Sequence, residues 1–577
     1  MRRKIFTFQQ LIIVCVALAT ALTCNAWERK AIWPKGKMPH PQSGQVAAMT
    51  DETEKPGFDS TRHRTPYLEW FDAPAKENHT GTCMILISGG SYVDCCDVEL
   101  IEEWREKLTP LGVQCVNFVY RTPRPAGLPI YQSAWEDGQR AVRMVRAQAK
   151  KRGFNPERIG IVCMSAGSHL GLLLAGNSQT PAYQPVDSYD TIPCHINLAV
   201  VLSPAYVTTD AESGTPAERQ GFGTDVSMSA LFKFDSFTCP LSLHHGGIDI
   251  YSPNGSSLVY NKLHTMGIPA ELHIYPGLDH GAYGFDHGIE FMRQMGFLGK
   301  ISPAEPIVHT QFVDADLRIK KEQLWPAGAT PNAIEFQPEP AIEWFVPSRL
   351  TANGVQIICS VRDYGAATAA NPEMDAVRRY LNSKGIAVVK LTPRTSQLSG
   401  LAVHTTSWQD LQRAIRLVRS EASSYGLSPD KIGVMGIGAG AHLALLGAVS
   451  SLHQSYLPID DIDRLPCSVK WGVCISPSGV LAEGNSHHGN QHKESPIAPE
   501  FVFDLKTAPT LFLHGESDPQ SSLGPVKVWE KMRAIGVQSE LHTAVLPDGS
   551  FNVVGSPATG SYTWVEKIYD YVRQQMK

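Results

Sequence analysis

The chain has 577 residues, more than one hydrophobic core usually organises, so two domains are expected. Its formal net charge of −5 at pH 7 provides no basic field for nucleic acid or an anionic membrane surface, which excludes those two classes of partner. The cysteines show no spacing typical of metal ligands, so we expect neither a metal nor a cofactor, and the oligomeric state stays open.

Residues 1–26 have the pattern of a secretory signal peptide. A basic start at 2–4 precedes an apolar run at 11–22, and small residues follow before the mature chain. The run is too short to prefer spanning a bilayer, and no later segment is long and apolar enough to do so. We therefore expect a secreted or periplasmic protein without a membrane span. A lipid anchor on Cys24 is the weaker alternative, because Thr23 is a poor residue before a lipidated cysteine.

After the leader, apolar runs of strand length alternate with segments of helical spacing. The predicted helices cover 98–108 and 135–151. The predicted strands are 84–87, 115–119, 159–163, 198–202, 241–244 and 271–275. This alternation predicts an α/β fold with a doubly wound, mostly parallel sheet.

A glycine pair, Gly89 and Gly90, follows the first of these strands. Glycines allow a substrate to approach backbone N–H groups closely, so the pair is a candidate part of an oxyanion hole. An ordinary turn would use the same residues.

Residues 159–170 combine a buried strand, a sharp turn with one serine and a helix that opens with small residues. This is the pattern of a nucleophile elbow, where bulky neighbours would collide with the adjacent backbone. Ser165 is the candidate nucleophile, and the N–H of Ala166 is a candidate oxyanion donor. Gly167 meets the size requirement, whereas Cys163 is a small departure where glycine is usual. A buried serine at an ordinary strand-helix junction is the alternative.

An acid and a histidine follow in the order Ser, Asp, His that doubly wound hydrolases use. A serine hydroxyl needs a base to take its proton and a third group to hold that base in the correct tautomer. Asp249 follows the strand predicted at 241–244, and His280 lies in a glycine-framed loop after 271–275. We assign Asp249 as the orienting acid and His280 as the base. Asp279 is the second choice of acid, because neighbouring residues rarely face each other well.

The same pattern is written twice along the chain. The matched segments are 31–36 with 323–328, 68–71 with 342–345, 135–143 with 408–416, 159–170 with 432–443, and 270–273 with 539–542. Nearly constant spacing over about 250 residues favours duplication of a whole domain. We predict a catalytic domain at 27–300, a linker at 301–320 and a second domain at 321–577.

The first repeat carries one set of motifs over nearly its whole length: Trp33-Pro34-x-Gly36, Gly89-Gly90-x-Tyr92, Tyr120-Arg121, Trp135-x-Asp137-x-Gln139-Arg140-Ala141, Ser165-Ala166-Gly167-x-His169-Leu170, His245-x-x-x-Asp249 and His280-Gly281. These motifs resemble bacterial secreted α/β-hydrolases of the acetylxylan esterase, or polysaccharide esterase, type. The resemblance implies removal of acetyl or similar small acyl groups from carbohydrate. Two positions depart from that pattern, Ser88-Gly89-Gly90-Ser91 in place of Pro-Gly-Gly-Gly and Cys163 in place of glycine.

The second repeat lacks the residues of this site. The positions of Ser165, His280, Gly89 and Gly90 are taken by Gly438, Gly549, Val361 and Arg362, and Asp518 alone keeps the place of Asp249. Loss of the nucleophile removes about 10⁶ in kcat, so an inactive hydrolase-like domain is expected. His169 recurs there as His442, which predicts structural roles for both; His244 and His245 are expected to pack or hydrogen-bond at a strand end.

We therefore predict a secreted serine carboxylesterase that works through an acyl-enzyme on acetylated polysaccharide or oligosaccharide. A peptidase of the prolyl-oligopeptidase type shares the fold and triad but usually adds a propeller domain. A non-catalytic carbohydrate-binding protein is the alternative of another class. The histidine-rich run at 485–492 fits no metal-binding spacing, so a solvated loop is expected there.

Overall fold

The computed structural model describes residues 28–41, 65–71, 78–95, 98–123, 127–209, 227–298, 316–333, 339–361, 364, 371–395, 399–482, 495–516, 518, 520–545 and 564–577. It divides into two compact units, Met1–Asn197 and Leu198–Lys577. The predicted signal peptide, the histidine-rich run at 485–492, Arg362 and Gly549 lie outside the described residues. Within the described residues, none of the helices combines the length and apolar character that crossing a membrane requires.

The first unit contains five strands in the order β1-β2-β4-β3-β5. Their bounds are β1 Glu28–Ala31, β2 Tyr67–Trp70, β3 Cys83–Ile87, β4 Gln114–Val119 and β5 Ile159–Met164. The three central strands β3, β4 and β5 are parallel, and β1 and β2 are antiparallel additions. The helices are α2 Val98–Leu108, α3 Gln132–Arg152 and α4 Ala166–Gly176, with short 3₁₀ turns at Thr109–Leu111 and Ser188–Thr191. β3 is buried throughout, as expected for a central parallel strand made of a continuous apolar run.

The second unit begins with three parallel strands, β6 Leu198–Leu202, β7 Leu241–Gly246 and β8 Ala270–Tyr275. It continues through the second repeat with β9 Leu317–Gln323, β10 Ala341–Pro347, β11 Val355–Cys359, β12 Ala387–Thr392, β13 Ile432–Ile437, β14 Trp471–Ile475, β15 Thr510–Gly515 and β16 Glu540–Ala544. Its helices are α5 Asn254–Thr265, α6 Phe285–Gln294, α7 Pro372–Ser383, α8 Thr405–Glu421, α9 Ala439–Val449, α10 Leu523–Ala534 and α11 Trp564–Gln575, with 3₁₀ turns at Ala422–Tyr425 and Asp461–Arg464. The strand order is β6-β7-β8-β16-β15-β14-β13-β11-β12-β10-β9, and β8 pairs antiparallel with β16.

The two repeats use the same strand order. Within the first unit β1-β2-β4-β3-β5 corresponds to β9-β10-β12-β11-β13 of the second repeat, and within the second unit β6-β7-β8 corresponds to β14-β15-β16. Each repeat opens with an antiparallel pair and continues as a parallel sheet with helices between its strands. The predicted α/β fold is confirmed: each repeat is a mostly parallel sheet with helices between its strands. The predicted strands and helices agree with the observed elements to within three residues at each end.

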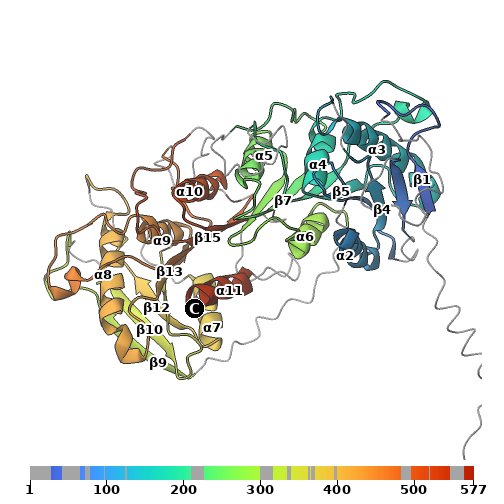
Figure 1. The fold of residues 1–577 in the computed structure, drawn as a ribbon. Coiled ribbons are helices and arrows are strands. Elements are labelled where there is room, and N and C mark those ends of the chain that lie inside the picture. The colour runs from blue at the N-terminus through green and yellow to red at the C-terminus, as the bar shows by residue number, and fades with distance from the viewer. Residues whose placement is uncertain are drawn as a thin grey trace, which may run out of the picture. The chain divides into compact units, whose positions relative to one another are not determined.

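The core of the second repeat lies between its sheet and two helices. Apolar side chains of α7 and α11 pack on strands β11 to β15, around Trp471 and Trp564. α9 packs against β13 and β14 (Figure 1). β9 begins at Leu317, so the end of the predicted linker is already strand, while residues 299–315 lie outside the described residues.

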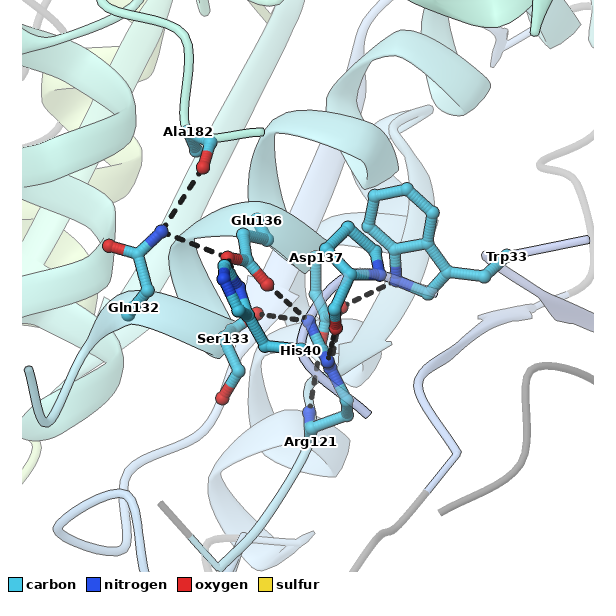
Figure 2. A network of polar contacts seen from close by, with 9 residues as sticks. Trp33, His40, Arg121, Gln132, Ser133, Glu136, Asp137 and Ala182 are labelled. Carbon is cyan, nitrogen blue, oxygen red and sulfur yellow. Dashed lines mark hydrogen bonds and ion pairs between the residues drawn. The ribbon is translucent and has the colours of Figure 1, made fainter. Parts of the chain in front are cut away.

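A buried ionic network explains why the Trp-Pro and Trp-x-Asp motifs occur in both repeats. In the first unit the guanidinium of Arg121 donates to the Asp137 carboxylate at 2.9 Å and to Glu136 at 2.9 Å, and the Trp33 indole donates to Asp137 at 2.6 Å (Figure 2). His40 contacts Glu136 at 2.6 Å. A buried carboxylate must be paired and hydrogen-bonded, and this network provides both while it ties the N-terminal segment to α3.

The second repeat builds the same network. Arg394 donates to Asp410 at 3.1 and 3.0 Å, and Trp325 donates to Asp410 at 2.7 Å. Because the network is present in a repeat that has no serine at the elbow, its role is to hold the fold.

Candidate active site

Ser165 lies between β5 and α4 in a strained backbone conformation. Its φ is 57° and its ψ is −123°, a region that residues other than glycine rarely adopt. The residue is 6% exposed, and its carbonyl accepts from the His169 N–H at 3.1 Å as α4 begins. This is the sharp strand-to-helix turn that the sequence pattern predicts.

Glycines at two positions of α4 let this turn form. A Cβ on Gly167 would lie 2.3 Å from the carbonyl oxygen of Ser88, so the start of α4 abuts the backbone that leads into the glycine pair. A Cβ on Gly171 would lie 2.5 Å from the sulfur of Cys163, so the missing side chain makes room for the thiol. Burial raises the pKa of the Cys163 thiol to about 12, so the group is neutral. The missing side chain at Gly171 therefore accommodates a cysteine at position 163, where glycine is usual.

The hydroxyl of Tyr120 contacts the backbone of the loop that contains Gly89 and Gly90. The Tyr120 hydroxyl lies 3.1 Å from the Ser88 carbonyl oxygen and 3.2 Å from that of Gly89. In a trans peptide the N–H is opposite the carbonyl, so the Gly89 and Gly90 N–H groups point away from Tyr120. Gly90 has φ +120°, and a Cβ there would lie 2.1 Å from the Asp94 carbonyl oxygen, so this position requires glycine.

His169 anchors the same loop to α4. Its Nδ1 lies 2.7 Å from the Tyr92 hydroxyl, and burial lowers its pKa to about 3, which keeps the ring neutral. In the second repeat His442 contacts Tyr364 at 2.8 Å in the same way. Both histidines therefore connect a loop to a helix.

In the second unit, Asp249 and His280 form a hydrogen-bonded pair. The Nδ1 of His280 lies 3.0 and 2.9 Å from the two carboxylate oxygens of fully buried Asp249. Asp249 also accepts from the Tyr251 N–H at 2.8 Å. Burial opposes ionisation of this carboxyl, but hydrogen bonds from His245 and His280 outweigh it and hold the pKa of Asp249 below its usual range.

The same carboxylate has a second imidazole partner that the sequence interpretation did not assign. The Nε2 of His245 lies 3.2 Å from the Asp249 carboxylate and 3.1 Å from the Tyr251 carbonyl, and its Nδ1 lies 2.8 Å from the Ser256 hydroxyl. The spacing His245-x-x-x-Asp249, part of the resemblance noted from sequence, was the signal available.

The loop around His280 is fixed by backbone contacts. The Ser203 hydroxyl donates to the Gly281 carbonyl at 2.7 Å. The Asp279 carboxylate is exposed and accepts from the His280 backbone N–H at 2.7 Å, whereas the His280 imidazole is held by Asp249.

The structure brings the predicted site residues together in two groups, one in each compact unit. Ser165 and Ala166 lie beside the loop of Gly89 and Gly90 within Met1–Asn197. Asp249 and His280 are paired within Leu198–Lys577. A cavity of about 610 Å³ in the second unit is lined by Gly247, Ile248, Asn254, Glu530 and Arg533 among others, and neither Asp249 nor His280 lines it.

The second repeat keeps two backbone turns of the site, with glycine at the position of the serine. Gly438, at the position of Ser165, has φ 58° and ψ −121°. Asp518, at the position of Asp249, accepts from the Gln520 N–H at 2.9 Å. This turn is the one that Asp249 forms with the Tyr251 N–H. Asp249 therefore holds a turn as well as a histidine.

The sequence model of the BD-FAE family matches residues 71–209 and 355–466, one segment in each repeat. Endo-1,4-beta-xylanase B of Butyrivibrio fibrisolvens is 26% identical over 211 residues, which make up 34% of this chain and 32% of that protein. The match thus spans about a third of the relative's length. Among solved structures, an acetyl ester-xyloside bifunctional hydrolase from Caldicellulosiruptor lactoaceticus is 22% identical, with 44% of this chain and 87% of that chain covered and a TM-score of 0.33. Thermogutta terrifontis esterase 2 is 20% identical, with 41% and 91% covered and a TM-score of 0.34.

Proposed function

We propose that this chain is a serine carboxylesterase that removes acetyl or similar small acyl groups from carbohydrate through an acyl-enzyme. The observation that carries the proposal is the contact of 2.9 Å between His280 and the buried carboxylate of Asp249. Ser165, with a φ of 57°, precedes both residues in the chain order that doubly wound hydrolases use. A hydrogen bond at Nδ1 orients the ring and leaves Nε2 on its opposite side as the nitrogen that exchanges the proton.

In the proposed reaction, His280 Nε2 takes the proton of Ser165 as its oxygen attacks the ester carbonyl. The tetrahedral intermediate collapses when His280 returns that proton to the sugar oxygen, which leaves as an alcohol and leaves the acyl group on Ser165. Water, deprotonated by His280, then attacks the acyl-enzyme, and the acid and free Ser165 are released. Asp249 stabilises the imidazolium that forms on His280 during acylation and again during deacylation.

The developing oxyanion is proposed to be held by backbone N–H groups of Ala166, Gly89 and Gly90. Support comes from Gly167, whose contact with Ser88 places the start of α4 against the glycine loop. Preorganised amides of this kind lower the barrier because they need no reorganisation as charge develops.

Carbohydrate as substrate and export as location belong to the same proposal. The match to the BD-FAE model and the xylanase-named relative support a substrate of the xylan type. We propose that residues 1–26 direct export, and that the second repeat, with Gly438 at the elbow, is inactive and packs beside the active repeat or binds the glycan.

The test is hydrolysis of 4-nitrophenyl acetate and acetylated xylo-oligosaccharide by Ser165→Ala. We expect loss of at least about 10³-fold in kcat, together with loss of labelling by a fluorophosphonate probe. Asp518→Asn, which changes the residue of the second repeat at the position of Asp249, is expected to keep full turnover. Undiminished turnover by Ser165→Ala removes this serine from the mechanism. Cleavage of dipeptidyl amides in preference to acetyl esters supports the peptidase alternative, and an unlabelled wild-type chain supports a binding protein.

A further inference from the structure

The sequence Glu-Leu-His occurs in both repeats, and its two copies lie opposite each other where strand β8 pairs with strand β16. Strand β8 carries Glu271 and His273, strand β16 carries Glu540 and His542, and the strands pair antiparallel with His273 directly opposite His542. Antiparallel partners on one face bring their side chains close together. The Nδ1 atoms of the two histidines are 3.0 Å apart, and both rings are buried.

The two imidazoles stand in a row between two carboxylates. The Nε2 of His273 lies 3.3 Å from Glu271, and the Nε2 of His542 lies 2.8 Å from Glu540. The row therefore contains three close contacts between polar atoms, and each needs a proton or a cation between its atoms. A neutral imidazole carries one N–H, so with both carboxylates ionised two imidazoles supply two protons for three contacts. Burial raises the pKa of Glu271, so a neutral Glu271 carboxyl is the alternative source of the third proton. If both Nε2 atoms donate to their carboxylates, two lone pairs face each other at the central contact.

A third histidine completes a ligand set at that central contact. His287, from α6, is partly buried, and the centre of its ring lies 4.3 Å from that of His273 and 5.4 Å from that of His542. One nitrogen from each of His273, His287 and His542 lies within 4.8 Å of the other two. Zn–N bonds are about 2.0–2.1 Å, so nitrogens bound to one ion lie about 3.3 Å apart, close to the 3.0 Å between the Nδ1 atoms of His273 and His542.

We propose that this joint binds one divalent transition-metal ion of the zinc class through His273, His287 and His542. Glu271 and Glu540 hold the first and last of these by the Nε2 N–H, which directs the Nδ1 lone pairs at the ion, as carboxylate partners do in metal sites. Lys567 also contacts Glu540 and faces the cluster. The ion ties β8 to β16 and has a structural role.

A second group of candidate ligands provides the internal control. His404, His442 and Glu500 also lie within reach of one ion. There His442 contacts the Tyr364 hydroxyl through Nδ1 and Glu500 through Nε2 at 3.4 Å, and the Tyr364 hydroxyl also contacts the Ala439 carbonyl at 3.2 Å. The joint differs from this group in bringing two imidazole nitrogens within 3.0 Å of each other, which favours the joint as the metal site.

The experiment measures metal content in the full chain. Because residues 485–492 contain three histidines, the background variant carries His487→Asn, His488→Asn and His492→Asn. It is loaded with Zn²⁺, dialysed and analysed by elemental mass spectrometry, and Co²⁺ loading reports coordination by visible absorption. We expect about one ion per chain, lost in His287→Leu and retained in His404→Gln.

Glu271→Gln keeps the experiment decisive if His287→Leu does not fold. A glutamine amide donates to His273 Nε2 and moves the ring proton to Nδ1, which opposes metal binding, so we expect affinity at least about 10-fold weaker in competition with a chelator. Less than 0.2 ion per chain in the background variant, or an ion lost in His404→Gln and kept in His287→Leu, overturns the proposal. If Glu271→Gln instead raises the melting temperature of a metal-free chain, the central contact holds a proton.

Discussion

Gly438 of the second repeat has the same backbone conformation as Ser165 of the first, φ 58° and ψ −121° against 57° and −123°. The turn is therefore a property of the fold, kept whether or not a hydroxyl is present. Glycine adopts this conformation without steric cost, whereas serine is strained in it. In the first repeat the strained residue is Ser165, whose hydroxyl lies at the end of β5.

Replacing Ser165 by glycine is expected to stabilise the chain while it abolishes esterase activity. Relief of the left-handed strain contributes about 1 kcal/mol, partly offset by the greater freedom of glycine in the unfolded chain. Urea unfolding of Ser165→Gly beside Ser165→Ala measures this, because alanine removes the hydroxyl but keeps the strain. Equal stability of the two variants would contradict the assigned strain.

Cys163 and Gly171 are expected to be coupled. Gly171→Ala places a methyl group 2.5 Å from the Cys163 sulfur and should cost about 1–3 kcal/mol. The second repeat has glycine and alanine at the matching positions, Gly436 and Ala444, so Cys163→Gly should rescue Gly171→Ala. A double-mutant cycle of unfolding free energies should give a coupling of about 1–2 kcal/mol. Additive single effects would exclude direct contact.

Tyr120 is expected to be a positioning residue for the oxyanion loop. Its hydroxyl contacts the Ser88 and Gly89 carbonyls, and the second repeat has Pro393 in its place. Tyr120→Phe keeps the ring and removes one hydrogen-bonding group worth about 1 kcal/mol, so kcat should fall about 5- to 10-fold with KM unchanged. A change confined to KM, or to the melting temperature, would show that the hydroxyl does not position the loop.

His245 is expected to tune the base through the carboxylate that it shares with His280. His245→Leu removes one hydrogen bond to a charged group, and we expect kcat/KM to fall about 10- to 100-fold. Asp249 then interacts more strongly with His280, so the acid limb of the pH–rate profile should move to higher pH. His245→Gln retains an N–H donor and serves as the matched control. An unshifted profile in His245→Leu would limit His245 to packing.

The lowered pKa of Asp249 predicts how stability depends on pH. A carboxyl whose folded-state pKa lies below its unfolded value of about 3.9 stabilises the fold above that pH and loses this contribution as pH falls through the folded pKa. Asp249→Asn should therefore be less stable than wild type at pH 5–7, and the difference should shrink below about pH 4. Urea unfolding across pH 3–7 tests this, with exposed Asp279→Asn as control. A constant difference would contradict the prediction.

Much of the fold could be predicted from the sequence because both repeats follow one simple pattern. Central parallel strands are continuous apolar runs, so the segment predicted at 198–202 is β6, Leu198–Leu202, and the helix predicted at 98–108 is α2. Asp249 is preferred to Asp279 because adjacent residues, such as Asp279 and His280, rarely orient their side chains toward each other.

Other features could not be predicted, because they depend on contacts between distant segments. The role of His245 depends on the turn that brings Asp249 back toward its own strand. The pairing of β8 with β16 joins two strand edges, and nothing in the periodicity of either strand specifies its neighbour. The division of the chain after Asn197 falls within the first repeat, where the sequence shows no shift in composition.

The antiparallel pairing of β8 with β16 also affects solubility. An unpaired strand at the rim of a sheet offers backbone donors and acceptors to any passing chain, and proteins that leave one exposed are prone to aggregate. Here each repeat closes the open rim of the other within a single polypeptide. A chain truncated after the first repeat would expose β8 along its length, and association with other copies would be the expected result.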